Sequence, residues 1–319
     1  MGRCARAVTA AALAATLGYA EFVYQGEWGS YGAGPGQFDR PYGVAVADNG
    51  LVYVTDFRNH RIQYFSATGN YLGGWGSEGK GEGQFYCPWG VAAYARRVYV
   101  TDTLNQRVQY FTRAGSFLGA WGGWGTGPGQ FRQPRGIAVS KSGRVYVADS
   151  YNHRVQYFTR DGSFLGMWGS RGTAPGQFDL PRGIVVPPSS RVYVADKKND
   201  RIQYFTADGD FLGAWGKNGT ANGFFVGPRG LAAPGDGRLF VTDEYCNRIQ
   251  YFTREGGFLG KWGQIGSGSG EFHFPAGCAF GPYGWFYVAD ERNHRIQYFR
   301  ESVPAVEPTS LGRVKALFR

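Results

Sequence analysis

The chain has 319 residues and a formal net charge of +10 at pH 7. Its 52 Gly, 24 Phe, 21 Tyr and 9 Trp, against only 2 Met, favour many short strands and tight turns, so we expect little helix. Its four cysteines are scattered and show no C-x2-C spacing, which excludes a disulfide framework and a RING-type zinc module in this chain.

Residues 1–20 have the layout of a secretory signal peptide. Arg3 and Arg6 precede the acid-free apolar stretch AVTAAALAATLGYA, which has small residues at Gly18 and Ala20. The apolar run is too short for a membrane span, so we expect no transmembrane span in the mature chain. This segment predicts a secreted or periplasmic protein. An organellar transit peptide or a wrongly assigned start is the alternative, and either would indicate an organellar or cytoplasmic protein.

A repeat follows directly and covers nearly all of the remaining chain. Segments such as VYVTDFRNHRIQYF recur six times, and their aspartates are separated by 46 residues once and by 47 residues thereafter. The repeated aspartates are Asp56, Asp102, Asp149, Asp196, Asp243 and Asp290. A fixed period of this length is typical of repeat architectures, which makes it the strongest indication of fold.

Each unit is predicted to form four short strands. The first follows a P-x-G step, the second ends at the repeated Asp, the third reads RIQYF and the fourth reads FLGAWG. A glycine such as Gly69 suits the tight turn between the third and fourth strands. Six such units predict an all-β, six-bladed β-propeller of four-stranded antiparallel blades over residues 21–300.

The two ends of the repeat region are complementary. A Trp-Gly step at Trp28 precedes the first complete unit, whereas the last unit stops after Phe299 without a fourth strand. Tyr24 to Trp28 should therefore pair as the outer strand of the blade begun by residues 275–299, closing the ring and protecting its edges. Residues 301–319 form a basic C-terminal tail, predicted to be a short helix or disordered.

The motif D-x-x-N-H-R-[IV]-Q, together with G-P-G-Q-F-x-x-P-x-G, resembles the NHL repeat family across residues 24–299. The resemblance implies a six-bladed propeller and three functional contexts: substrate-recruiting modules of ubiquitin ligases, binders of single-stranded RNA, and extracellular or periplasmic interaction proteins. A ligase role would need another chain, because this sequence shows no RING, B-box or coiled-coil pattern. A motif of this kind is specific for fold and says little about function.

Some repeated residues are expected to build the scaffold. Each repeated Asp is followed five residues later by an Arg, as in Asp56 and Arg61. We expect this carboxylate to accept backbone N–H bonds and a bidentate Arg, which would hold the turn between the second and third strands. The six strand tryptophans are expected to lie in the core between blades.

Positions that vary between repeats are candidates for recognition. The middle residue of P-x-G should border the central channel on one face, and five of these residues are aromatic or basic: Tyr42, Trp89, Arg135, Arg182 and Arg229. We call these five residues the P-x-G crescent; the sixth position is Ala276. Arginine beside aromatic rings suits planar and anionic ligands and is common at binding hot spots. The alternative is that the middle residue of the turn is merely exposed.

Histidines raise a second possibility. His60, His273 and His294 come from neighbouring loops, and three imidazoles could hold a catalytic Zn²⁺ with an open water site. Such a site would resemble the peptidylglycolate amidating lyases, relatives with an NHL-like propeller. The three histidines occupy different motif positions, however, and the lyase ligands have no residue-by-residue match here.

The sequence therefore favours a non-catalytic scaffold that recognises a protein or a polyanion through its P-x-G face. The candidate ligands are an acidic glycan, an acidic protein or single-stranded RNA, bound by a monomeric propeller without a cofactor. The alternatives are a zinc-dependent lyase or hydrolase and a substrate-recruiting module of a ubiquitin ligase. No catalytic residue is assigned, since no G-x-S-x-G elbow or P-loop is present. A disulfide between Cys246 and Cys278 is left open.

Overall fold

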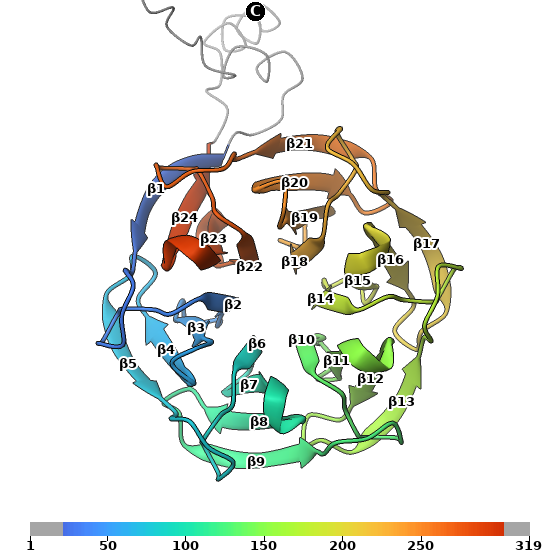
Figure 1. Cartoon of the computed structure of the whole chain (residues 1–319), viewed down its shortest axis with the longest axis horizontal. Helices are drawn as coiled ribbons and strands as arrows, with labels where there is room; N and C mark the ends of the chain where they lie inside the picture. Colours follow the sequence, from blue (N-terminus) through green and yellow to red (C-terminus); the bar gives the residue numbers. More distant parts are fainter. Residues whose placement is uncertain (1–21, 303–319) are drawn as a thin grey trace, which may run out of the picture.

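A computed structural model describes residues 22–302, and these residues form a closed ring of six blades (Figure 1). Each blade is a four-stranded antiparallel sheet with its first strand nearest the axis, so the predicted all-β, six-bladed propeller is confirmed. The predicted signal peptide and most of the basic tail lie outside the described residues. Among the described residues, no helix has the length and hydropathy needed to cross a membrane.

The strands follow the chain in blade order around the ring. The first blade contains β2 (Pro41–Val46), β3 (Val52–Asp56), β4 (Arg61–Phe65) and β5 (Tyr71–Trp75). The second contains β6 (Pro88–Tyr94), β7 (Arg97–Asp102), β8 (Arg107–Thr112) and β9 (Phe117–Gly122). The third contains β10 (Pro134–Val139), β11 (Val145–Asp149), β12 (Arg154–Phe158) and β13 (Phe164–Trp168).

The remaining blades repeat this order. The fourth contains β14 (Pro181–Val185), β15 (Val192–Asp196), β16 (Arg201–Phe205) and β17 (Phe211–Trp215). The fifth contains β18 (Pro228–Ala232), β19 (Arg238–Asp243), β20 (Arg248–Thr253) and β21 (Phe258–Trp262). The sixth contains β22 (Pro275–Phe280), β23 (Trp285–Asp290), β24 (Arg295–Glu301) and β1 (Phe22–Trp28).

Five short 3-10 turns accompany the strands. They are η1 (Thr103–Asn105), η2 (Ser150–Asn152), η3 (Lys197–Asn199), η4 (Pro282–Gly284) and η5 (Glu291–Asn293). All except η4 follow directly after the Asp that ends a second strand. They therefore lie on the same face as the P-x-G steps, because Pro41 pairs with Asp56 and the other blades have the same register.

The sixth blade closes as the two chain ends predicted. β1 pairs antiparallel with β24, with Trp28 opposite Ile296 and Phe22 opposite Glu301. The ring of Phe22 stacks on Trp262 of the fifth blade at 5.1 Å between centroids. The N-terminal strand thus completes one blade and packs against the next.

The repeated Asp organises the loop that precedes the first strand of its blade. Asp56 accepts a hydrogen bond from the Asp39 amide at 2.8 Å, and from Arg61 Nε at 2.8 Å. Arg61 donates its remaining N–H groups to the carbonyls of Ala33, Gly34 and Gln37. The scaffold role is confirmed, but the bidentate geometry is wrong, because the fork of the guanidinium holds the preceding loop and only Nε bonds the carboxylate.

The glycine of P-x-G is required by the close approach of neighbouring inner strands. A Cβ on Gly136 would lie 2.0 Å from the Arg182 carbonyl oxygen, and one on Gly183 would lie 2.1 Å from that of Arg229. Only a residue without a side chain fits there. The middle residue of P-x-G is thereby held close to the axis.

Candidate functional site: an arginine-rich axial pocket

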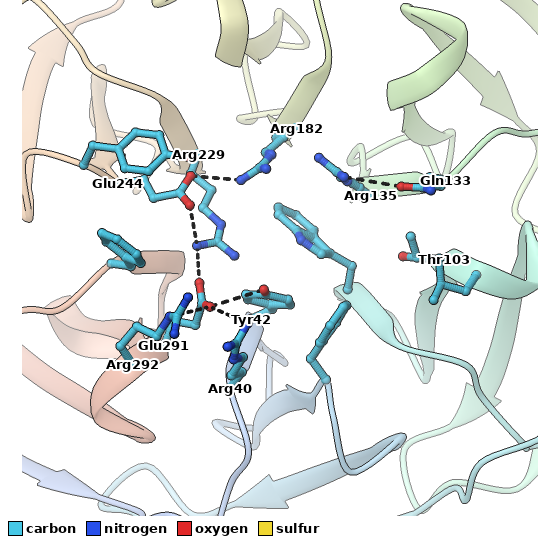
Figure 2. Close-up of a pocket in the computed structure, with 15 residues that line it drawn as sticks. Arg40, Tyr42, Thr103, Gln133, Arg135, Arg182, Arg229, Glu244, Glu291 and Arg292 are labelled. Carbon is cyan, nitrogen blue, oxygen red and sulfur yellow. Dashed lines mark hydrogen bonds and ion pairs between the residues drawn. The ribbon is translucent and has the colours of Figure 1, made fainter.

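All five residues of the P-x-G crescent line one pocket on the axis of the ring (Figure 2). Its cavity measures about 250 Å³. Further along the axis a second cavity of about 70 Å³ is lined mainly by the P-x-G glycines and by apolar residues such as Val44, Val91 and Ile137. The channel is therefore charged at one face and narrow and apolar behind it.

Arg229 forms the buried centre of the pocket wall. Only 1% of the residue is exposed, and its Nη1 lies 2.6 Å from Glu291 and 3.4 Å from Glu244. The guanidinium also lies over Tyr42, 4.4 Å from the ring centroid, and near Trp89 at 5.7 Å. Burial opposes the charge of Arg229, but the two carboxylates outweigh this effect and raise its pKa above the ordinary value.

Arg182 and Arg135 occupy the next two positions around the ring, on β14 and β10. Arg182 forms a 2.9 Å ion pair with Glu244, whereas Arg135 has no carboxylate partner among the described residues and donates a 3.4 Å hydrogen bond to Gln133. Burial, with Arg229 and Arg135 nearby, lowers the pKa of Arg182 to about 10. Burial, followed by the charge of Arg229, also lowers the pKa of Arg135.

Two glutamates balance part of this charge. Glu244 also forms a 2.8 Å ion pair with Lys197, and Glu291 accepts a 3.3 Å hydrogen bond from the Tyr42 hydroxyl. Burial alone would raise the pKa of Glu244, but Arg229, Arg182 and Lys197 together lower it to about 2. Both carboxylates are therefore committed to pairing the arginines and Lys197.

Glu244 and Glu291 were not predicted as pocket residues, although their positions in the repeat carry a signal. Both directly follow a repeated Asp, at a position that also varies between blades: Phe57, Thr103, Ser150, Lys197, Glu244 and Glu291. Four of these six residues line the axial pocket.

The residue four positions after each repeated Asp has a structural role, although its residue type differs between the repeats. All six adopt a left-handed backbone conformation, and each side chain accepts a hydrogen bond from a backbone amide of the next blade. In five of them the donor lies 27 residues later in the sequence, and His294 accepts from Arg40, the equivalent residue of the first blade. The six donor-to-acceptor distances range from 2.5 to 3.3 Å. We call these residues the blade latch: His60, Gln106, His153, Asp200, Asn247 and His294.

The proposed zinc ligands do not converge. Nδ1 of His60 accepts a hydrogen bond from the Cys87 amide, and Nδ1 of His294 accepts one from the Arg40 amide. Each of these nitrogens is therefore occupied by a hydrogen bond to the next blade. His273 lies in the loop entering the sixth blade, where its backbone amide donates to Asp290. Within residues 22–302, no group of three or more His, Cys, Asp or Glu side chains is placed to hold a metal ion.

The described cysteines are thiols rather than disulfides. Cys246 and Cys278, like Cys87, are free, so the two are not bonded to each other in this structure. Burial raises the pKa of both Cys246 and Cys278, which disfavours the reactive thiolate at neutral pH. None of these three cysteines lines the axial pocket.

Comparison with known proteins identifies the repeat. The NHL repeat matches residues 38–65 and 131–158, which contain the first three strands of the first and third blades. The chain is an NHL-repeat β-propeller. A 51-residue stretch is 41% identical to the B-box type zinc finger protein ncl-1 of Caenorhabditis elegans, and covers 16% of this chain and 6% of that protein.

Several solved structures share the fold of this NHL propeller. A protein of unknown function from Bacteroides thetaiotaomicron has a TM-score of 0.66 at 18% identity, covering 89% of this chain and 76% of its own. A gluconolactonase from Xanthomonas campestris has a TM-score of 0.64 at 16% identity, covering 92% and 94%. A catalytically inactive virginiamycin B lyase from Staphylococcus aureus, solved with quinupristin, has a TM-score of 0.60 at 18% identity, covering 90% of each chain. At these identities the likeness shows the fold alone.

Proposed function

We propose that this NHL propeller is a non-catalytic recognition scaffold that binds an anionic ligand through its P-x-G face. The ligand classes are an acidic protein, an acidic glycan or single-stranded RNA. One observation carries the proposal: the five crescent residues share one axial pocket, whose arginines outnumber its carboxylates. The pocket is lined by five Arg and only two Glu.

The charge imbalance supports binding from solution. Arg229 is neutralised by its two glutamates, but Arg135 has no carboxylate partner within the described residues. Arg40 and Arg292 add further positive charge at the pocket, 3.9 and 3.5 Å from the same Glu291 oxygen. A cleft lined by one sign of charge attracts ligands of the opposite sign and speeds their association.

An outer cavity of about 230 Å³, distinct from the narrow cavity behind the axial pocket, adjoins the pocket and offers room for a larger ligand. The two cavities share Gln133, and the outer one is also lined by Gln106, Trp124, Arg132 and Tyr151. Trp124 is 68% exposed, and the Arg132 guanidinium lies over its ring at 5.1 Å. Such an exposed ring beside arginine suits stacking of a planar group next to the anion site.

Salt-dependent binding tests this function. We would titrate single-stranded RNA, an acidic polysaccharide and polyglutamate into the wild type and into the double variant Arg135→Gln/Arg182→Gln. We expect affinity for at least one ligand to fall steeply with salt, because bound cationic groups release counterions, and to fall at least about tenfold in the double variant.

A matched control variant distinguishes the effect of the pocket arginines on binding from the effect of the net charge of the protein. Arg160→Gln/Arg171→Gln removes the same charge from two exposed arginines outside the axial pocket. We expect this control to bind within about threefold of the wild type, since remote exposed charges contribute little. Equal binding by both double variants, or binding that is insensitive to salt, would contradict the proposed function.

A further inference from the structure

Three neighbouring arginines of the P-x-G crescent each have a buried nitrogen without a partner. These atoms are Nη1 of Arg135, Nε of Arg182 and Nε of Arg229, and none has a hydrogen-bond acceptor among the described residues. The three residues come from the third, fourth and fifth blades and line the same pocket. A buried N–H without an acceptor is costly, and it is more costly on a charged group.

The protein supplies acceptors to the three arginines unequally. Arg229 contacts both glutamates and Arg182 contacts one, whereas Arg135 has only the Gln133 amide oxygen at 3.4 Å and lies over the Tyr151 ring at 5.5 Å. Figure 2 shows the Arg135 and Arg182 side chains entering the pocket from neighbouring strands, with both glutamates on the Arg229 side. The uncompensated positive charge is therefore concentrated at Arg135.

The dimensions of the pocket limit what can enter. A cavity of about 250 Å³ is below the range of drug-sized ligand pockets. Behind it the axis narrows to the cavity of about 70 Å³, whose wall is glycine and apolar side chains. A continuous polyanion cannot thread through this wall, so only a compact group can reach the buried arginines.

We propose that the axial pocket is a subsite for one compact oxyanion, a carboxylate or a phosphate, held between Arg135 and Arg182. This inference rests on the proposed function and names the part of the ligand that enters the axis. The planar fork of a guanidinium matches either oxyanion with two parallel N–H bonds. The oxyanion comes from a free small molecule or from the end of a chain lying across the P-x-G face.

Titration with small anions tests the subsite directly. Inorganic phosphate, acetate and benzoate would each be titrated into the wild type, Arg135→Gln and the control Arg171→Gln by calorimetry at low ionic strength. We expect saturable binding with one site per chain, weakened at least about tenfold by Arg135→Gln and unchanged by Arg171→Gln. Preference for phosphate or for the carboxylates identifies the oxyanion.

A competition experiment distinguishes the two sources of the oxyanion. It also separates the subsite from the broader recognition function. A peptide with a free C-terminal carboxylate, compared with its amidated form, tests for a chain end. Displacement of the bound small anion by the free peptide alone supports a chain end, and displacement by neither form supports a free small molecule. Absence of saturable small-anion binding, or small-anion binding that is equal in Arg135→Gln, would overturn the subsite. Polyanion binding that survives this result would leave the broader recognition function standing.

Discussion

At the scale of single residues, the arginines of the axial pocket differ in how many carboxylates they pair with. Arg229 is enclosed by Glu244, Glu291 and the Tyr42 ring, so removing it would leave the buried Glu291 without its closest ion-pair partner. Breaking a buried ion pair by removing one partner typically costs about 3–5 kcal/mol. Arg135 and Arg182 are therefore the informative positions for binding experiments, and Arg229 is a framework residue of the pocket.

Lys197 should make anion binding depend on pH. Burial, followed by the charge of Arg182, lowers the pKa of Lys197 to about 8. A bound anion stabilises the charged ammonium, so binding is favoured below this pKa and weakens as the pH rises through it. We expect affinity for a small anion to fall roughly three- to tenfold between about pH 7 and about pH 9.5.

The control for this pH dependence is Lys197→Met, measured by the same calorimetry. Methionine preserves most of the side-chain volume but does not titrate, so the decrease between the two pH values should be lost. A decrease of the same size in the variant would assign the titration to another group.

At the scale of elements, each blade is joined to the next by a hydrogen bond whose chemistry varies but whose geometry does not. Imidazole, amide and carboxylate side chains all serve as acceptors in the blade latch. What the positions share is a left-handed backbone, with φ between 50° and 59°, and an acceptor at the right reach. Residue type therefore varies between repeats at two kinds of position: at the blade latch, where the side chain has a structural role, and at P-x-G, where it lines the axial pocket.

Substitution of His153 tests the latch. Nδ1 of His153 accepts the Leu180 amide at 3.3 Å. His153→Asn retains an acceptor of the kind that Asn247 provides and should keep stability within about 0.5 kcal/mol. His153→Gly tolerates the left-handed backbone but leaves the Leu180 amide unpaired, and should lose about 1–2 kcal/mol in urea unfolding. Equal stability of the two variants would contradict the latch.

At the scale of the whole molecule, the ring depends on a strand from the opposite end of the chain. β1 supplies the outer edge of the sixth blade, and Phe22 packs against Phe240, Trp262 and Phe286 at 5.1 to 5.8 Å between centroids. This aromatic cluster joins the fifth and sixth blades. Closure thus combines backbone pairing with apolar burial, which protects a strand edge that would otherwise be open.

Adjacent residues of β1 provide a matched test of closure. Phe22→Ser should lower the free energy of unfolding by about 2–3 kcal/mol, because it removes aromatic burial. Val23→Ser lies on the opposite face, where the side chain is 45% exposed, and should change stability by less than about 0.5 kcal/mol. Guanidinium unfolding of both variants measures the difference, and equal losses would show that closure depends on backbone pairing alone.

The repeat pattern by itself determined the number of blades, their strand order and the closure by the N-terminal strand. Regular spacing and strand alternation are local properties, so they can be read along the chain. It also located the P-x-G crescent at the axis, because identical positions in a closed ring must converge.

Only the tertiary structure decided what those residues do. Arg229 is paired with Glu244 and Glu291 from two different blades, and Arg135 is left without a carboxylate, which no single repeat reveals. His60 and His294 were candidate metal ligands in sequence, yet their Nδ1 atoms are occupied by amides of the following blade. The physical reason is that charge pairing and hydrogen bonding act between blades, across distances that the repeat period does not encode.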